Sequence, residues 1–193
     1  MTDQSILVID VGGISVKLTT GIDQPGEIRS FPSPKNMTPQ QLVEHTASMT
    51  GDWQYDLISI GYPGPVKNNQ PWREPVNLGS GWVVFDYEQA FGHPVKMVND
   101  AAMQALGSYQ GRDMLFLGLG TGLGTALILD GHIVPLEIAH LPFREEQTFE
   151  TLLGKAGLDA SGFDDWLQNL LDAINLFSYA LCTDYVVLGG GNA

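Results

Sequence analysis

Residues 117–131, with the sequence LGLGTGLGTALILDG, constrain the fold more than any other segment of the chain. Five glycines and two threonines lie among apolar residues, a pattern that predicts a strand, a glycine turn and a second strand. The glycines alternate and a strand follows them, so the segment is not the dinucleotide-binding fingerprint, which needs a helix at that point. It is not a Walker P-loop either, because no lysine follows the final glycine.

The same pattern occurs a second time, starting at Ile6, with Gly12 and Gly13 in the turn. After each copy, a helix and a strand that ends in polar or glycine-rich residues follow, which indicates two related halves. Because SYQGRD interrupts the pattern near Gly111, we expect one lobe over residues 1–110 and another over residues 111–193.

The other expected elements include a helix that starts at Thr38 and Pro39 and stops at Gly51. Residues 163–182 show an apolar helical face, and the single cysteine, Cys182, falls on it. We therefore expect a buried thiol there rather than a catalytic one.

Composition excludes several classes of protein. No apolar run approaches the roughly 20 residues of a membrane helix, so we expect a cytoplasmic protein that does not interact with membranes. One cysteine allows no intramolecular disulfide and no thiolate-rich zinc site. Nine Lys and Arg against 22 Asp and Glu argue against nucleic acid as a partner, and a phosphate ligand would depend on backbone amides and a metal ion.

Both glycine turns can bind phosphate, because the missing Cβ atoms let an anion approach and turn amides can donate to its oxygens. Thr121 would add a hydroxyl donor. Glycines that simply close a tight hairpin explain either turn equally well when it is taken alone. Asp10, just before the other turn, adds a carboxylate that can hold Mg²⁺ through water.

Five motifs occur in an order that resembles the sugar kinases of the ROK family, within the actin/hexokinase/Hsp70 ATPase superfamily: VIDVGGISVK, ISIGYPGPV, VKMVNDAAMQALG, LGLGTGLGTALILDGHIVPLEIAH and YVVLGGGNA. The resemblance implies an α/β, actin-like (ribonuclease H-like) fold with mixed sheets flanked by helices and two related lobes. No cysteine-rich zinc motif follows EIAH, so the chain is most similar to the zinc-less branch that includes polyphosphate glucokinases.

The resemblance also implies roles for individual residues. The phosphate and nucleotide loops would contain Asp10, Gly12, Gly13, Lys17, Gly120, Thr121, Gly122, Gly189, Gly190 and Gly191. The sugar would be bound by Asn99, Glu137, His140, Gly64, Asn77 and Glu150, with Asp100 as the catalytic base.

The residues themselves leave simpler roles open. Asp100 can accept a proton from a sugar hydroxyl or cap the following helix, and only the other motifs favour the base. Asn99 can bind a diol or be an ordinary polar loop residue, and Lys17 can reach a phosphate or be an exposed strand lysine. Glu137 and His140 converge only if their segment makes a turn.

Three features depart from the family pattern. Ile14 stands where the family has threonine, so a hydroxyl donor to phosphate is lost. Ala139 replaces a glycine, and a positive φ there would strain it by roughly 1 kcal/mol or more. Family members continue past GGG, so we expect an incomplete C-terminal lobe in a chain that ends at Ala193.

We therefore expect a Mg²⁺-dependent, zinc-free kinase that phosphorylates a hexose, with glucose favoured. The donor stays open between ATP and polyphosphate, and the small number of cations favours ATP slightly. The alternatives are a catalytically weak sugar-binding or sensing domain, or a structural fragment that forms a homodimer through its uncovered edge.

Overall fold

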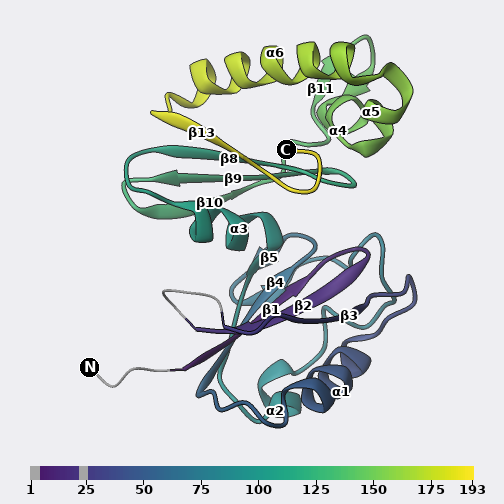
Figure 1. Cartoon of the computed structure of the whole chain (residues 1–193), viewed down its shortest axis with the longest axis vertical. Coiled ribbons are helices and arrows are strands. Elements are labelled where there is room, and N and C mark those ends of the chain that lie inside the picture. The colour runs from purple at the N-terminus through teal and green to yellow at the C-terminus, as the bar shows by residue number, and fades with distance from the viewer. Residues whose placement is uncertain (1–4, 22–25) are drawn as a thin grey trace. The chain divides into compact units, whose positions relative to one another are not determined.

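The computed structural model describes residues 5–21 and 26–193, and the chain divides into two compact units, Met1–Asp100 and Ala101–Ala193 (Figure 1). Each unit contains one main sheet with helices packed on it. The lobes expected over residues 1–110 and 111–193 stay a prediction. None of the helices within the described ranges combines the length and the apolar character needed to cross a membrane.

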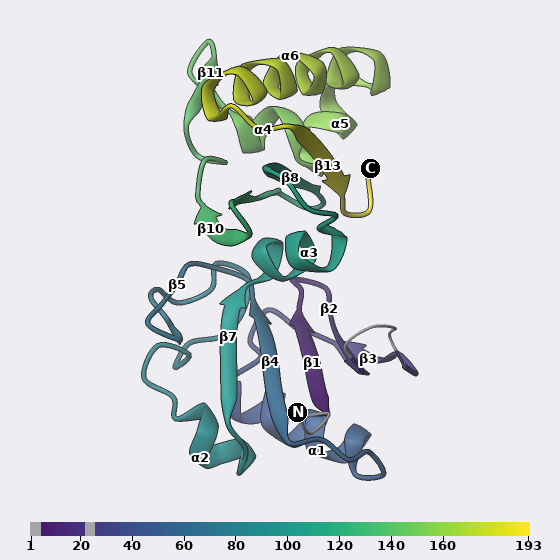
Figure 2. The same cartoon turned by 90° about the vertical axis from the view of Figure 1, so that its left-hand side faces the viewer.

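The first unit contains a five-stranded sheet in the order β3-β2-β1-β4-β7 (Figure 2). The strands are β1 (Ile6–Val11), β2 (Ser15–Thr20), β3 (Arg29–Pro32), β4 (Leu57–Tyr62) and β7 (Val95–Asn99). β1 and β2 form the expected antiparallel hairpin, whereas β4 runs parallel to both β1 and β7. A small hairpin, β5 (Val66–Lys67) and β6 (Gln70–Pro71), follows β4.

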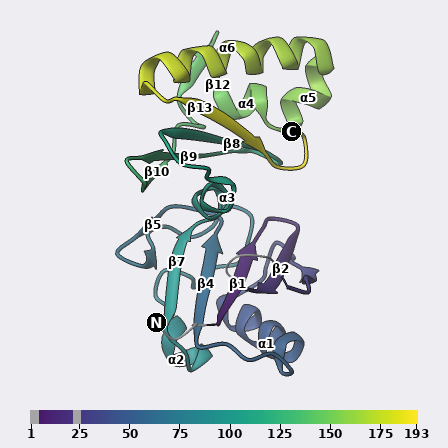
Figure 3. The same cartoon turned by 60° about the vertical axis from the view of Figure 1, so that its left-hand side comes forward.

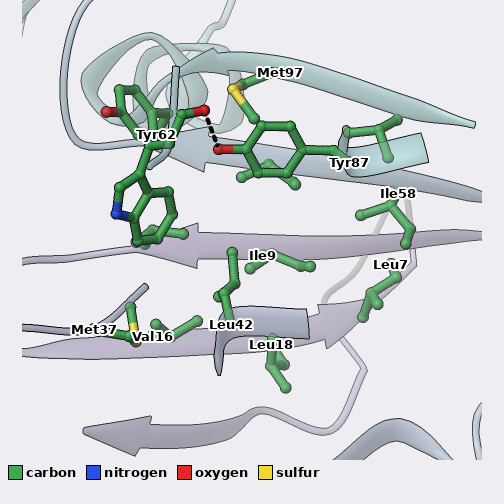
Figure 4. Packing of buried hydrophobic residues seen from close by; sticks show 14 of the residues in the cluster. Leu7, Ile9, Val16, Leu18, Met37, Leu42, Ile58, Tyr62, Tyr87 and Met97 are labelled. Carbon is green, nitrogen blue, oxygen red and sulfur yellow. Dashed lines mark hydrogen bonds between the residues drawn. The ribbon is translucent and has the colours of Figure 1, made fainter. Parts of the chain in front are cut away.

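One face of this sheet forms the hydrophobic core of the first unit. Successive side chains of a strand point to opposite faces of the sheet, so apolar residues at every second position lie on one face. The register partners Ile9 and Ile60 lie side by side there. Figure 4 shows this layer, together with the hydrogen bond from the Tyr87 hydroxyl to the carbonyl oxygen of Trp82 (3.0 Å). Burial of these side chains therefore fixes which residues of β1 point to the opposite face, Asp10 among them.

Two helices cover the core face, α1 (Pro39–Thr50) and α2 (Tyr87–Phe91) (Figures 1 and 3). Thr38 caps α1 in a capping box with Gln41, and Pro39 takes the first helical position, as the sequence predicts. Leu42 buries its whole side chain from α1. An alanine in its place would cost about 2–5 kcal/mol of stability.

The second unit repeats the arrangement of four strands of the first, β3-β2-β1-β4, and has no counterpart of β7 in its sheet. Its sheet has the order β10-β9-β8-β13, with β8 (Met114–Leu119), β9 (Leu123–Leu129), β10 (His132–Leu136) and β13 (Tyr185–Gly189). β8, β9 and β10 are antiparallel neighbours, and β13 pairs with β8 in parallel, as β4 does with β1. The internal repeat inferred from the two glycine turns is therefore present in the strand order.

Helices lie on both faces of this second sheet (Figure 3). α3 (Asp100–Ser108) lies on one face, and α4 (Phe149–Leu153), α5 (Lys155–Ser161) and α6 (Phe163–Leu181) lie on the other. A two-stranded ribbon, β11 (Pro142–Arg144) and β12 (Gln147–Thr148), precedes α4.

The expected burial of Cys182 is wrong. α6 ends at Leu181, and Cys182 is its C-cap in the left-handed region (φ 54°), with an exposed thiol. Within residues 163–182, where we expect an apolar helical face, Trp166 and Phe177 are buried, but Phe163 and Leu171 are exposed. Cys182 follows the last helical residue, so the helical periodicity no longer determines which way its side chain points.

Candidate functional site

Ser33 holds the first glycine turn from one side. The Gly12 amide closes the turn by donating to the carbonyl oxygen of Ser15 (3.1 Å). The buried Ser33 hydroxyl donates to the carbonyl oxygen of Gly12 (2.6 Å), and its amide donates to that of Ile14 (3.0 Å). In a trans peptide the N–H and C=O point in opposite directions, so the Gly13 amide points away from Ser33. The turn therefore presents a backbone donor that can bind an anion.

Asp10 lies directly across the hairpin from Lys17, its register partner on β2. Burial raises the pKa of the Asp10 carboxyl, and the charge of Lys17 partly offsets this by lowering it. Among the described residues, no group of three or more His, Cys, Asp or Glu side chains could hold a metal ion. A single partly buried carboxylate suits Mg²⁺, which takes most of its remaining ligands from water and substrate phosphates.

Asn77 lies beside the first turn. A Cβ built on Gly13 would lie 3.9 Å from both Cβ and Nδ2 of Asn77. The carboxylate of Glu74 fixes the same loop by accepting from the amides of Trp82 (3.0 Å) and Val83 (3.4 Å). The first unit thus brings one predicted sugar-side residue next to a predicted phosphate loop.

The other candidate residues of the first unit lie where β4 and β7 end. Asn99 is the register partner of Tyr62, and its side-chain amide donates to the carbonyl oxygen of Gly64 (3.2 Å). Asn99 is buried, and the partly exposed Asp100 opens α3 as its first residue. β1, β4 and β7 are parallel, so their carboxyl ends meet at one edge of the sheet, the usual place for a ligand in such sheets.

A cavity of about 320 Å³ lies at the other end of these strands. Thr50, Trp53, Tyr55 and His93 line it, and the last three precede β4 or β7 in the chain. This cavity is therefore separate from the candidate site of the first unit.

The second glycine turn is also held from one side. The Lys155 amide, at the start of α5, donates to the carbonyl oxygens of Gly120 (3.0 Å) and Thr121 (3.3 Å). The Gly120 amide donates to the carbonyl oxygen of Gly122 (3.1 Å). Since the two carbonyls bound by Lys155 point toward it, the amides of Thr121 and Gly122 point away. Two adjacent amides with this orientation form a concave site that suits a phosphate oxygen.

Glu150 lies against this second turn, and its charge acts on Glu137. A Cβ on Gly122 would lie 2.9 Å from Oε2 of Glu150, and the Glu150 amide donates to the carbonyl oxygen of Ala139 (2.9 Å). Partial burial raises the pKa of the Glu137 carboxyl. The charge of His140 lowers this pKa, and the charge of Glu150 raises it. Ala139 does not have a positive φ, so alanine at this position is not strained by its backbone conformation. The second unit thus brings His140 and Glu150 within electrostatic reach of Glu137.

The last glycines lie against the start of the same turn. Gly189 ends β13 as the register partner of Gly118 on β8. Gly190 has a φ of 90°, and a Cβ on it would lie 2.4 Å from the carbonyl oxygen of Leu119. Gly190 is therefore required by both conformation and space, whereas a Cβ on Gly191 would meet nothing within 4 Å.

The candidate residues thus form one group in each unit. The first unit holds Asp10, Gly12, Gly13, Lys17, Gly64, Asn77, Asn99 and Asp100. The second unit holds Gly120, Thr121, Gly122, Glu137, His140, Glu150, Gly189, Gly190 and Gly191. Their joint action on one sugar and one donor stays a prediction. Sequence reasoning missed Ser33, because its partner Gly12 is 21 residues away and no local pattern marks such a contact.

Comparison with known proteins gives relatives over most of the chain. The bifunctional enzyme NanE/NanK of Brucella melitensis is 29% identical over 67% of this chain and 27% of its own length. The polyphosphate glucokinase of Mycobacterium leprae is 24% identical over 95% of this chain and 62% of its own length. The chain therefore spans less than two thirds of the length of each of these two relatives.

Solved structures share the fold. The inorganic polyphosphate/ATP-glucomannokinase of Arthrobacter sp. strain KM has a TM-score of 0.82 at 23% identity, over 98% of this chain and 84% of its own. The ROK family glucokinase of Streptomyces griseus, in complex with glucose and AMPPNP, has a TM-score of 0.77 at 16% identity, over 97% and 83%. These likenesses confirm the predicted actin-like α/β fold. A model of the ROK family matches residues 6–135, well over half of the 193 residues, and the chain belongs to this family.

Proposed function

We propose that this chain is a sugar kinase that transfers a phosphoryl group to a hexose, with glucose as the expected acceptor. The observation that carries the proposal is the pair of glycine turns, in which neighbouring groups bind the carbonyls from one side and leave amides directed to the other. Turns of this kind can hold phosphate oxygens in a chain with few cations. Family membership supports the same chemistry.

Asp100 is the proposed general base. A sugar hydroxyl is a weak nucleophile, so a carboxylate that accepts its proton assists attack on a phosphoryl group held in line. Asn99 would bind neighbouring hydroxyls through its amide. We assign further hydroxyl contacts to Glu137, His140 and Glu150, since carboxylates accept and an imidazole can donate or accept. Gly64 and Asn77 would shape the sugar side.

The proposed donor is ATP, with polyphosphate as the alternative that the names of two relatives suggest. Residues 101–193 contain only three cations, and two of them are in ion pairs, Arg144 with Asp172 and Lys155 with Asp159. A long polyanion normally depends on Lys and Arg for its affinity, which favours ATP. Asp10 would hold Mg²⁺ through water, and bound Mg²⁺ neutralises charge on the phosphate oxygens.

The proposal is tested by incubating the protein with Mg²⁺, a sugar and a donor, and measuring sugar phosphate. Glucose, mannose and N-acetylmannosamine should each be paired with ATP and with polyphosphate. We expect glucose 6-phosphate with ATP, at a higher kcat/KM than with polyphosphate. Absence of any phosphorylated sugar from a folded protein that binds glucose would refute the kinase.

A second candidate is a sugar-binding or sensing domain with weak catalysis. The observation that favours it is Ile14, a side chain 78% exposed on the first turn, where the family has a hydroxyl donor. Calorimetry that detects glucose binding but no binding of an ATP analogue would support this candidate over the kinase. We expect a cytoplasmic protein in either case. Whether it forms a homodimer is tested by sedimentation over a range of protein concentrations.

A further inference from the structure

Asn192 makes two hydrogen bonds to the second glycine turn. Its backbone amide donates to the carbonyl oxygen of Leu119 (3.0 Å), and its side-chain Nδ2 donates to that of Gly120 (3.1 Å). The Gly120 oxygen also accepts the Lys155 amide, so it is bound from two directions. Asn192 lies 72 residues beyond Gly120, which makes this contact a tertiary link between two glycine loops.

The orientation of the Thr121 amide depends on this link. The carbonyl of Gly120 and the N–H of Thr121 belong to one planar trans peptide, so fixing the oxygen also fixes the N–H. The side chain of Asn192 partly determines this orientation, because its amide is a donor of suitable length. An alanine at this position keeps the backbone N–H but has no side-chain donor, and the side chain of an aspartate, which has the same size as asparagine, offers only acceptor oxygens.

We propose that Asn192 is a positioning residue that aligns the amides of the second glycine turn for an anion and links the turn to residues 189–191. This inference rests on the proposed function, because it assigns the turn to the phosphates of the donor. Thermodynamic linkage makes this coupling reciprocal. An anion bound at the turn must restrain the loop that carries Asn192, and loss of the Asn192 contact must weaken the binding of the anion.

The variants Asn192→Ala and Asn192→Asp test the alignment, with Asn175→Ala as the control. The Asn175 side chain lies exposed on α6 and makes no hydrogen bond to any described residue. We expect Asn192→Ala to bind inorganic tripolyphosphate about three- to tenfold more weakly than the unchanged protein, the effect of one lost neutral hydrogen bond. Asn192→Asp should bind still more weakly, since its charge would repel both the Gly120 oxygen and the anion.

Two further readouts separate positioning from a purely structural role. Donor KM should rise in Asn192→Ala while the KM for the sugar stays unchanged, whereas general destabilisation would affect both. Hydrogen exchange measured without ligand should become faster over residues 119–122 in Asn192→Ala. In the unchanged protein, tripolyphosphate should slow exchange over residues 190–193.

The inference is overturned if Asn192→Asp binds tripolyphosphate as tightly as the unchanged protein, or if exchange over residues 119–122 is the same in Asn192→Ala. The proposed function fails separately, if the unchanged protein binds neither glucose nor tripolyphosphate. Even if the proposed function fails, hydrogen exchange of Asn192→Ala and of the unchanged protein, measured without ligand, decides whether Asn192 positions the turn.

Discussion

Replacement of Gly190 by alanine tests whether the loop of residues 189–193 is held on the second glycine turn. Gly190 has a φ of 90°, a conformation that costs an L-residue about 1–2 kcal/mol. The new Cβ would lie 2.4 Å from the carbonyl oxygen of Leu119, and overpacking of this kind adds about 1–3 kcal/mol. The strain therefore totals about 2–5 kcal/mol.

At the centre of each range, the hydrogen bonds that hold the loop are weaker than this strain. Asn192 donates to the carbonyl oxygens of Leu119 and Gly120, and two such bonds contribute about 1–3 kcal/mol. Detachment of the loop therefore costs less than keeping it in place with alanine at position 190. We expect Gly190→Ala to release the loop and to lower the free energy of unfolding by the same amount, about 1–3 kcal/mol.

Urea denaturation gives the loss of stability, and hydrogen exchange shows where the structure loosens. Gly191→Ala is the matched control, because its Cβ would meet nothing within 4 Å and its φ is not positive. Its free energy of unfolding should lie within about 0.5 kcal/mol of that of the unchanged protein. Equal stability of the two variants, with unchanged exchange over residues 119–122, would refute the reasoning.

Three other substitutions test the first turn. Asp10→Asn should raise the free energy of unfolding at neutral pH, because burial raises the pKa of the Asp10 carboxyl and so disfavours its charged form. This gain in stability should vanish as the pH falls below 3.8, the ordinary pKa of an aspartate. A variant that unfolds at lower urea concentration than the unchanged protein at pH 7 would contradict this. Ile14→Thr, at an exposed position, should lower donor KM about two- to tenfold without changing sugar KM, and unchanged donor kinetics would count against a phosphate contact there. Ser33→Ala removes the hydroxyl that donates to the carbonyl oxygen of Gly12 and should lower the free energy of unfolding, measured by heat or urea, by about 0.5–1.5 kcal/mol. The control Ser30→Ala, at an exposed position, should leave it unchanged. Equal effects of the two substitutions would exclude this hydrogen bond as a source of stability.

Local sequence patterns predicted the parts of the fold that depend on neighbouring residues. Glycines between alternating apolar residues predicted both hairpins, and Thr38 with Pro39 predicted the start of α1. The turn at Asn68 and Asn69 was missed although its signal was present, since two adjacent asparagines readily adopt the positive φ of a tight hairpin.

Contacts between distant residues could not be predicted in this way. The Asn69 side chain donates to the carbonyl oxygen of Val95 (2.8 Å) and accepts the Met97 amide (2.7 Å), so it binds the outer edge of β7. Ser33 and Asn192 bind the two glycine turns in a comparable manner, over 21 and 72 residues. Glycine spacing located both turns, but only the tertiary structure shows which groups bind their carbonyls.

Phosphorus NMR of the reaction itself tests the kinase most directly. With glucose, Mg²⁺ and ATP, the unchanged protein should convert the γ-phosphate signal into a sugar phosphate signal. Asp100→Asn should bind glucose but transfer about 100-fold or more slowly, because an amide cannot accept the proton. Asparagine has nearly the same size as aspartate and the position is partly exposed, so the variant should fold. No sugar phosphate from the unchanged protein, or equal rates for both proteins, would contradict the account.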